Sequence, residues 1–219
     1  THYVDVPRWE MRAQLAEEKI ALGFYFSGHP WDAYKPEISR WVRRDLSRLE
    51  PAKDLTMLAG IVSDIRTQMT KRGKMAFIVL EDGNARVEVS VFNELFDAVR
   101  HKLKTDEPLI VEGKVSRDDF RDGLRIVADQ LMTLGEARSR FAKALRLSLN
   151  GHGQQEGAVR RLRDTLSPFV GGACPVRIVY RNALAQCELS TGQAWRVRLD
   201  DELLAQLRDW LSAENVEVV

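Results

Sequence analysis

The 219-residue sequence contains only two cysteines, Cys174 and Cys187, and no apolar run of the length that spans a membrane. So few cysteines cannot form a disulfide framework, and we expect free thiols in a cytoplasmic protein. The short apolar runs exclude a membrane-spanning helix. Residues 1–7 lack the basic and apolar regions of a signal peptide. They also lack an initiator methionine, which indicates that the chain is a piece of a longer protein.

The chain also lacks an excess of either charge, because 33 basic residues stand against 32 acidic ones. Residues 1–55, 56–134 and 135–219 carry net charges of 0, −1 and +2. No segment is therefore broadly cationic, and any contact with nucleic acid has to come from a local cluster of cations. Near-neutrality limits the affinity that such a cluster can reach, because binding scales with the number of phosphates neutralised.

Catalytic patterns are missing as well. The sequence has no Asp-x-Asp pair, no Cys-x-x-Cys or His-x-x-x-His spacing and no Gly-x-Ser-x-Gly turn. Residues 151–157 resemble a dinucleotide-binding turn, but Glu156 stands where the third glycine is needed. A glycine turn before a helix explains this segment more simply, and we expect no catalytic site, metal or cofactor in this chain.

Residues 56–134 have the pattern of a small β-barrel. Strands are expected at 57–63, 75–81, 85–92, 109–117 and 124–131, with a helix at 94–104, capped by Asn93, before the fourth strand. Three strands, a helix and two strands is the order of a five-stranded OB-fold barrel. Gly60 and Gly113 fall inside strands, where a small barrel needs sharp bends.

The flanking segments complete an α+β multidomain chain. Residues 1–55 are expected to be helical, with a helix at 8–23 and an irregular one at 31–49. Residues 135–219 predict a small α+β domain with helices at 136–144, 155–166 and 201–212 and strands at 145–149, 176–181, 184–190, 195–199 and 216–219. Pairing Arg181 with Leu184 in its hairpin places the two cysteines too far apart for a disulfide.

OB folds hold single strands with basic loops and with aromatic side chains on which bases stack. The candidate cations gather around the two hairpins and the third strand: Arg66, Lys71, Arg72, Lys74, Arg86, Arg117, Arg121 and Arg125. Phe77 and Phe92 are the aromatic candidates for stacking, with filling of the barrel core as the simpler role for each.

Residues 18–30 read EKIALGFYFSGHP. They resemble the Glu-x-x-x-Leu-Gly-x-Tyr-x-Ser/Thr-Gly-His-Pro signature of the alpha subunit of bacterial DNA polymerase III, which precedes the OB domain in that family. The similarity continues through residues 59–60, 70–73, 80–83, 111–120, 136–138 and 194–197, and so covers essentially the whole chain.

The resemblance implies a C-terminal fragment of that polymerase, with an OB domain near the single-stranded template. It also implies a C-terminal domain that docks the tau subunit of the clamp loader. The family's catalytic aspartates, with their Mg²⁺, lie upstream of this fragment, and no clamp-binding motif stands in residues 1–17. For tau we select the end of the last helix and a tail that orders on its partner: Trp210, Leu211, Asn215, Val216, Glu217, Val218 and Val219. The alternative is a purely structural connector with no DNA contact.

Overall fold

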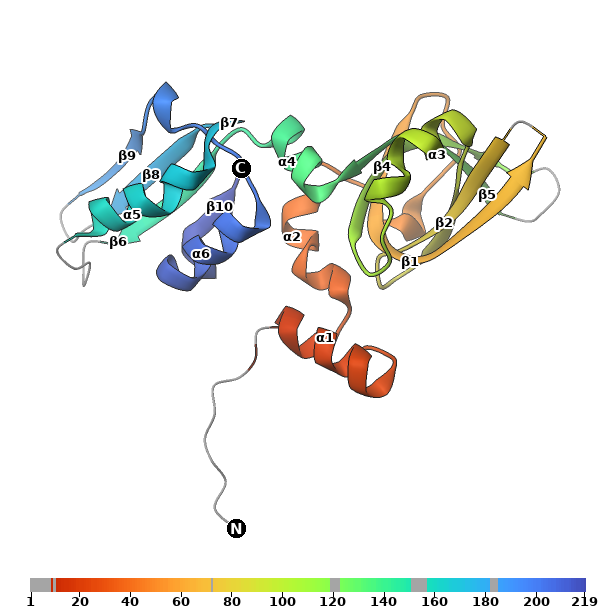
Figure 1. Cartoon of the computed structure of the whole chain (residues 1–219), viewed down its shortest axis with the longest axis horizontal. Coiled ribbons are helices and arrows are strands. Elements are labelled where there is room, and N and C mark those ends of the chain that lie inside the picture. The colour runs from red at the N-terminus through yellow and green to blue at the C-terminus, as the bar shows by residue number, and fades with distance from the viewer. Residues whose placement is uncertain (1–8, 10, 72, 119–122, 151–156, 182–184) are drawn as a thin grey trace, which may run out of the picture. The chain divides into compact units, whose positions relative to one another are not determined.

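The computed structural model describes the chain except for residues 1–8, 10, 72, 119–122, 151–156 and 182–184 (Figure 1). The chain divides into two compact units, Thr1–Thr133 and Leu134–Val219. Among the described residues, every helix is too short or too polar to cross a membrane.

A closed five-stranded barrel forms most of the first unit, with its strands in the order β1-β2-β3-β5-β4. The strands are β1 Thr56–Thr70, β2 Gly73–Glu81, β3 Arg86–Val91, β4 Pro108–Arg117 and β5 Leu124–Thr133. Helix α3, Asn93–Val99, and the 3-10 turn η3, Arg100–Lys102, connect β3 to β4. The predicted OB-fold barrel is therefore confirmed, although Phe92 rather than Asn93 is the residue that caps α3.

The barrel closes because strand β1 pairs with two neighbours along its length. Its first part pairs with β4 from Thr56 to Ile61, and its remainder pairs with β2 as far as Thr70. Gly60 and Gly113 permit the bends that this requires. A Cβ atom would lie 2.8 Å from the Glu81 carbonyl oxygen at Gly60, and 2.5 Å from that of Val127 at Gly113. Any larger residue would therefore force neighbouring backbones apart.

Alternation along the strands sorts side chains between the barrel interior and its outer surface. On β2, Ala76, Ile78 and Leu80 are buried in the apolar core. Their partners across the strands, such as Val89 and Val91 on β3, are buried with them. The intervening residues of β2 must therefore face outward.

The segment before the barrel consists of short helical pieces: α1 Met11–Leu22, η1 Pro30–Ala33, α2 Lys35–Ile38 and η2 Leu46–Arg48. Leu46 and Leu49 belong to the barrel core, so this segment is packed against the barrel. The Asp82 carboxylate strengthens the attachment, since its Oδ2 accepts a hydrogen bond from the Leu46 backbone N–H at 2.8 Å.

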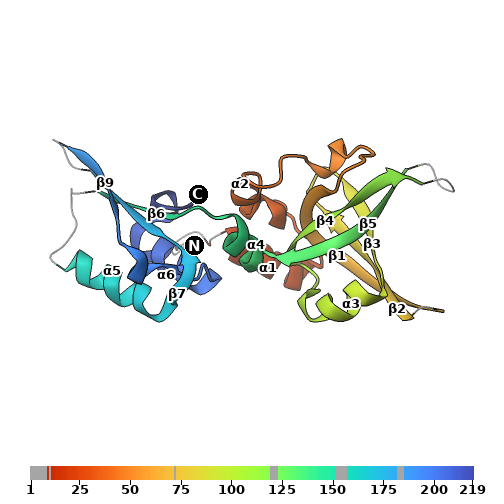
Figure 2. The ribbon, with the colours of Figure 1, turned by 90° about the horizontal axis from the view of Figure 1, so that it is seen from above.

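The second unit is a four-stranded sheet in the order β10-β6-β8-β9. Its sheet strands are β6 Leu145–Asn150, β8 Val176–Arg181, β9 Gln186–Ser190 and β10 Val216–Val218, and its helices are α4 Leu134–Phe141, α5 Ala158–Leu166 and α6 Asp201–Leu211. The 3-10 turns are η4 Ser167–Phe169, η5 Gln193–Trp195 and η6 Ala213–Asn215. Figure 2 shows α5 and α6 on the same side of this sheet.

Two expectations for the second unit are wrong. Residues 195–199 form no strand, because only Val197 makes bridges there, to Val170 and to Cys174 of the short strand β7, Val170–Cys174. In the hairpin, Arg181 faces Gln186 rather than Leu184, because the turn is longer than predicted. Both thiols are free as expected, with Cys174 buried and Cys187 exposed.

Replacement of Asp82 by alanine tests how strongly the leading segment is attached. The carboxylate is 4% exposed and also accepts hydrogen bonds from the backbone N–H groups of Asn84 and Ala85 at 3.0 and 2.8 Å. Removing it leaves buried N–H groups unsatisfied, so we expect Asp82→Ala to lower the free energy of unfolding by about 3 kcal/mol in urea denaturation. Asp97→Ala, at an exposed position of α3, is the control, with a change within about 0.5 kcal/mol. Equal effects of the two substitutions would contradict this role of Asp82.

Candidate functional site

A row of five side chains crosses the outer surface of the barrel from strand to strand. The register pairs Arg66 with Phe77, Phe77 with Ser90, Ser90 with Val127 and Val127 with Lys114. Arg66 and Lys114 are exposed, and the three residues between them are half-buried. The row therefore presents an aromatic ring with a cation at each end.

The two phenylalanines are not part of the barrel core, which corrects the simpler role expected for them. Phe77 faces outward because its neighbours Ala76 and Ile78 occupy the interior. Phe92 follows the last residue of β3 and is 42% exposed. Both rings therefore lie at the barrel surface, and their role in stacking stays a prediction.

Two of the candidate cations are already paired within the barrel. The Arg66 guanidinium contacts the carboxylate of Glu88 and also that of Asp64, with Nε 3.3 Å from Oδ2. Arg86 contacts Glu81, its partner across β2 and β3. A phosphate has to compete with these carboxylates, so Arg66 and Arg86 offer less attraction than their charge suggests.

The first hairpin carries cations at its tip. Lys71 is exposed in the turn after β1 and makes no ion pair with another described residue. Lys74, on β2, is also exposed, and its Nζ lies 5.9 Å from the centre of the Phe96 ring. Arg72 lies outside the described residues. The two described lysines are therefore available to a phosphate chain.

A second pair of cations stands at the hairpin between β4 and β5. Arg117 pairs in register with Leu124, and Arg125 with Ser116, so both arginines lie next to the turn. Both are exposed, and neither forms an ion pair with a described residue. Arg121 lies outside the described residues. Basic hairpin tips beside an aromatic strand face form an arrangement suited to single-stranded nucleic acid.

Sequence patterns missed Lys114, Ser90 and Val127. Nothing in the local sequence places Lys114 level with Phe77. The link runs through Val127 on β5 and Ser90 on β3. It depends on barrel closure.

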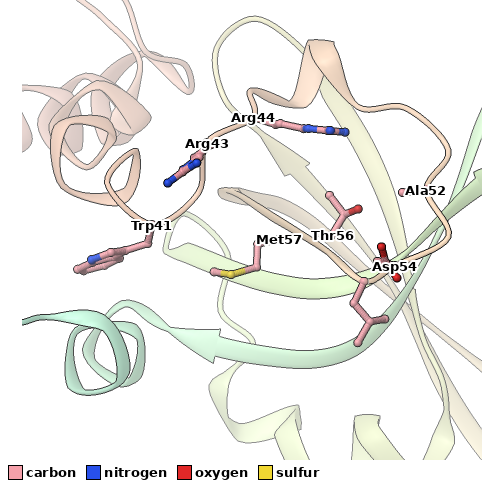
Figure 3. Close-up of a pocket in the computed structure, with 8 residues that line it drawn as sticks. Trp41, Arg43, Arg44, Ala52, Asp54, Thr56 and Met57 are labelled. Atoms are coloured by element: carbon pink, nitrogen blue, oxygen red, sulfur yellow. The ribbon is translucent and has the colours of Figure 1, made fainter.

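A hollow of about 350 Å³ lies at the start of β1 (Figure 3). It is lined by Trp41, Arg43, Arg44, Ala52, Asp54, Leu55, Thr56 and Met57. Figure 3 shows Arg43 and Arg44 pointing in opposite directions, so they do not converge on one anion. Within the described ranges, no three His, Cys, Asp or Glu side chains are placed to hold a metal ion. Residues 151–156 of the dinucleotide-like turn lie outside the residues that the structure describes.

The Gly-His-Pro segment folds back onto the end of α1. The Glu18 carboxylate accepts hydrogen bonds from the Phe26 and Ser27 backbone N–H groups at 2.7 and 2.9 Å, and from the Ser27 hydroxyl. These bonds, those with Ser27 above all, lower the pKa of Glu18 to about 2.

Further contacts join this segment to the barrel. The Tyr25 hydroxyl donates to Asp106 Oδ1 at 2.8 Å, and burial together with this carboxylate raises the pKa of Tyr25 to about 12. His29 Nδ1 accepts from the Trp31 N–H at 3.1 Å, and its ring lies against Gly83 at the β2–β3 turn. Burial lowers the pKa of His29, which keeps the ring neutral at pH 7. The signature residues therefore act as a brace within the first unit.

The candidate tau surface is different from what we expected. Leu211, Val216 and Val218 are buried, with exposed fractions of 7, 5 and 4%. The tail is strand β10, which pairs with β6, and the Val219 N–H donates to the Ala144 carbonyl at 2.9 Å. A segment already held in a sheet gains no further order when a partner binds. The expectation that the tail becomes ordered on tau is therefore wrong.

The remaining tail candidates are half-buried and make contacts within the unit. The Trp210 ring lies 5.0 Å from the Arg161 guanidinium, and Asn215 Nδ2 donates to the Leu211 carbonyl at 2.7 Å. Glu217 pairs with Arg146, with 3.5 Å between Oε2 and Nη1. These contacts hold the end of the chain in place.

Comparison with known proteins matches both units. Residues 57–134 match the OB-fold nucleic acid binding domain, and residues 161–211 match the C-terminal domain of DNA polymerase III subunit alpha. DNA polymerase III subunit alpha of Pseudomonas aeruginosa is 38% identical over 207 residues, 94% of this chain and 18% of that protein. The subunit of Neisseria meningitidis serogroup B is 41% identical over 217 residues, 98% of this chain and 19% of its own length. The chain thus spans about a fifth of the length of these relatives.

Among solved structures, the second OB-fold domain of replication protein A from Methanococcus maripaludis has 21% sequence identity. The match covers 42% of this chain and 93% of that domain, with a TM-score of 0.34.

The lowered pKa of Glu18 makes the order of the Gly-His-Pro segment sensitive to acid. Because the folded pKa, about 2, lies below the ordinary value of 4.5, the carboxylate stabilises the segment fully above pH 4.5. This contribution is lost as the pH falls from 4.5 towards 2. We expect the Phe26 and Ser27 amide resonances to shift with a midpoint near pH 2 in an NMR titration, and Glu18→Gln to abolish the shift. A midpoint near pH 4.5 would contradict the bonding of Glu18.

Proposed function

Because this chain belongs to the family of DNA polymerase III alpha subunits, we propose that it is a non-catalytic module of a replicative polymerase that contacts single-stranded DNA through its barrel. Nucleotide transfer and any Mg²⁺ that it needs are assigned to the remainder of the longer relatives, and this module needs no cofactor of its own. A replication role places it in the cytoplasm, within the polymerase holoenzyme.

The row from Arg66 through Phe77 to Lys114 is the observation that carries the DNA proposal. A half-exposed aromatic ring on a strand face accepts a base of any sequence, because every base has a flat face to stack. The cations at the two hairpins lie along the same barrel and can take the phosphates on either side.

The same surface limits the affinity. Five described cations of this surface are free of ion pairs with described residues: Lys71, Lys74, Lys114, Arg117 and Arg125. Neutralising about five phosphates gives a salt slope of at most roughly −3.5 for a single strand. The module therefore binds DNA weakly by itself and gains from being tethered to a polymerase that already holds the template.

The structural connector is the second candidate, and the brace around Glu18, Tyr25 and His29 favours it. A connector needs a rigid attachment between segments and no DNA contact. Measurement of DNA binding by the isolated chain separates the two candidates.

Two variants test the DNA surface by fluorescence anisotropy with a labelled oligo-dT at several salt concentrations. We expect Phe77→Ala to weaken binding by roughly 5-fold to 100-fold without changing the salt slope, since it removes stacking. Lys71→Ala with Lys74→Ala should instead reduce the slope by about 1.4, because two phosphate contacts are lost. Lys53→Ala, an exposed lysine ahead of the barrel, is the matched control and should bind as the wild type does. Absence of binding at low salt would favour the connector.

For the C-terminal domain we propose docking of the clamp-loader tau subunit, on the basis of the family and the match at residues 161–211. Burial of Leu211, Val216 and Val218 argues against the tail as the contact. A deletion of the tail would remove these core residues and so could not test tau binding separately from folding.

The tau proposal predicts that the intact chain and purified tau elute together in size-exclusion chromatography. The variant carrying Lys71→Ala, Lys74→Ala and Phe77→Ala is the control, and it should still bind tau because the barrel is assigned to DNA. Separate elution of the wild-type chain and tau would overturn the docking role.

A further inference from the structure

The sheet of the second unit has one apolar face, which is covered at one edge and open at the other. One cross-strand row consists of Val216, Leu147, Ile178 and Leu189. Val216 and Leu147 are 5% and 0% exposed. Ile178 is half-buried, and Leu189 on the edge strand β9 is 53% exposed. Burial of the side chains in this row therefore decreases from β10 to β9.

The next row repeats this gradient. Leu149 is 7% exposed, its partner Tyr180 is 37% exposed, and Cys187 beyond it is exposed. Solvent thus reaches Ile178, Tyr180, Cys187 and Leu189, which we call the β9 strip.

The helix layer ends before it reaches the β9 strip. Helix α6 packs at the β10 edge of the sheet and α5 lies beside α6. The Arg161 side chain, 5.0 Å from the Trp210 ring, identifies the flank of α5 that faces α6. Val159 and Arg163 are each two residues from Arg161, about 200° around the helix, and so lie on the opposite flank. Val159 is 81% exposed, so that flank of α5 is uncovered.

The other face of the sheet carries charged side chains, which suit exposure to solvent. Arg177 pairs with Glu188 at 3.3 Å, and Arg146 pairs with Glu217 at 3.5 Å. A sheet with ion pairs on one face and apolar side chains on the other buries the apolar face. The β9 strip is therefore the part of the apolar face that no helix covers. A third helix beside α5 would cover it.

The charged residues beside the β9 strip indicate which sign of charge such a helix would carry. Arg160 and Arg163 on α5 are both exposed, and Arg163 lies on the uncovered flank of that helix. Arg163 forms a surface ion pair with its neighbour Asp164, with 3.7 Å between Nε and Oδ1. A second copy of this chain would bring its own arginines against these, and like charges disfavour that contact.

We propose that the β9 strip is the docking site for an amphipathic helix of another protein, with its apolar stripe on the sheet and acidic residues next to Arg163. This inference rests on the proposed docking of tau and names the surface for it. Binding buries Leu189, Tyr180 and Cys187 and leaves the tail uninvolved.

Purified tau and the full chain provide the first test, by isothermal titration calorimetry. Leu189→Glu places a charge in the β9 strip at an exposed position, so it should fold and weaken tau binding at least tenfold. Ser190→Glu adds the same charge to the opposite face of the same strand and should bind as the wild type does. Asn215→Ala with Glu217→Ala, in the tail, should also retain binding. Equal affinities of the Leu189 and Ser190 variants would overturn the proposal while leaving the docking of tau intact.

Cys187 provides a direct footprint, because Cys174 is buried. Tau should slow the alkylation of Cys187 by iodoacetamide several-fold, and an unchanged rate would count against the β9 strip.

If wild-type chain and tau do not bind, the docking role fails, and two designed helical peptides test the β9 strip alone. Both carry leucine at i, i+3, i+4 and i+7, one with glutamate and the other with lysine elsewhere. The acidic peptide should protect Cys187 and lose affinity with Arg163→Glu. Equal binding of both peptides, binding of neither, or a dimer of the chain that Leu189→Glu dissociates would overturn the proposal.

Discussion

Closure of the barrel is the constraint on which the first unit depends. Strand β1 has to pair with β4 at one end and with β2 at the other, which bends it past Gly60 and brings Gly113 against Val127. Once the barrel closes, the pleat of each strand points successive side chains alternately into the interior and onto the outer surface. Ala76 and Ile78 fill the interior, and Phe77 is left on the surface between a cation at each end of its row. The candidate DNA surface is a consequence of closing the barrel.

The segment with the family signature contributes rigidity rather than chemistry. Glu18 closes the loop onto α1, Tyr25 reaches Asp106, and His29 packs against the turn at Gly83. Each of these polar groups makes a contact within the unit, and burial lowers the pKa of His29. Such a brace fixes the Gly-His-Pro segment and the end of α1 against the barrel, which a structural connector requires.

In the second unit, one face of the sheet carries ion pairs and the other carries apolar side chains. The apolar face is wider than the two helices that cover it. The tail strand β10 lies at the covered edge, where Val216 and Val218 complete the core. Strand β9 lies at the open edge, where Leu189 is exposed. The proposed docking surface therefore lies at the edge of the sheet that the two helices leave uncovered.

Local pattern determined the order of the elements, because alternation, helical periodicity and glycine turns are properties of neighbouring residues. The barrel strands, the hairpin at Asp82 and the helix at 201–211 were predictable on that basis. Local pattern could not decide whether Phe77 points into the barrel or out of it. It also could not decide whether Val216 packs in the core of its own unit or against a partner. Nor could it set the register that places Cys187 opposite Tyr180. Those outcomes depend on strands distant in sequence, since burial and pairing are set by which surfaces meet when the barrel closes and the sheet is covered.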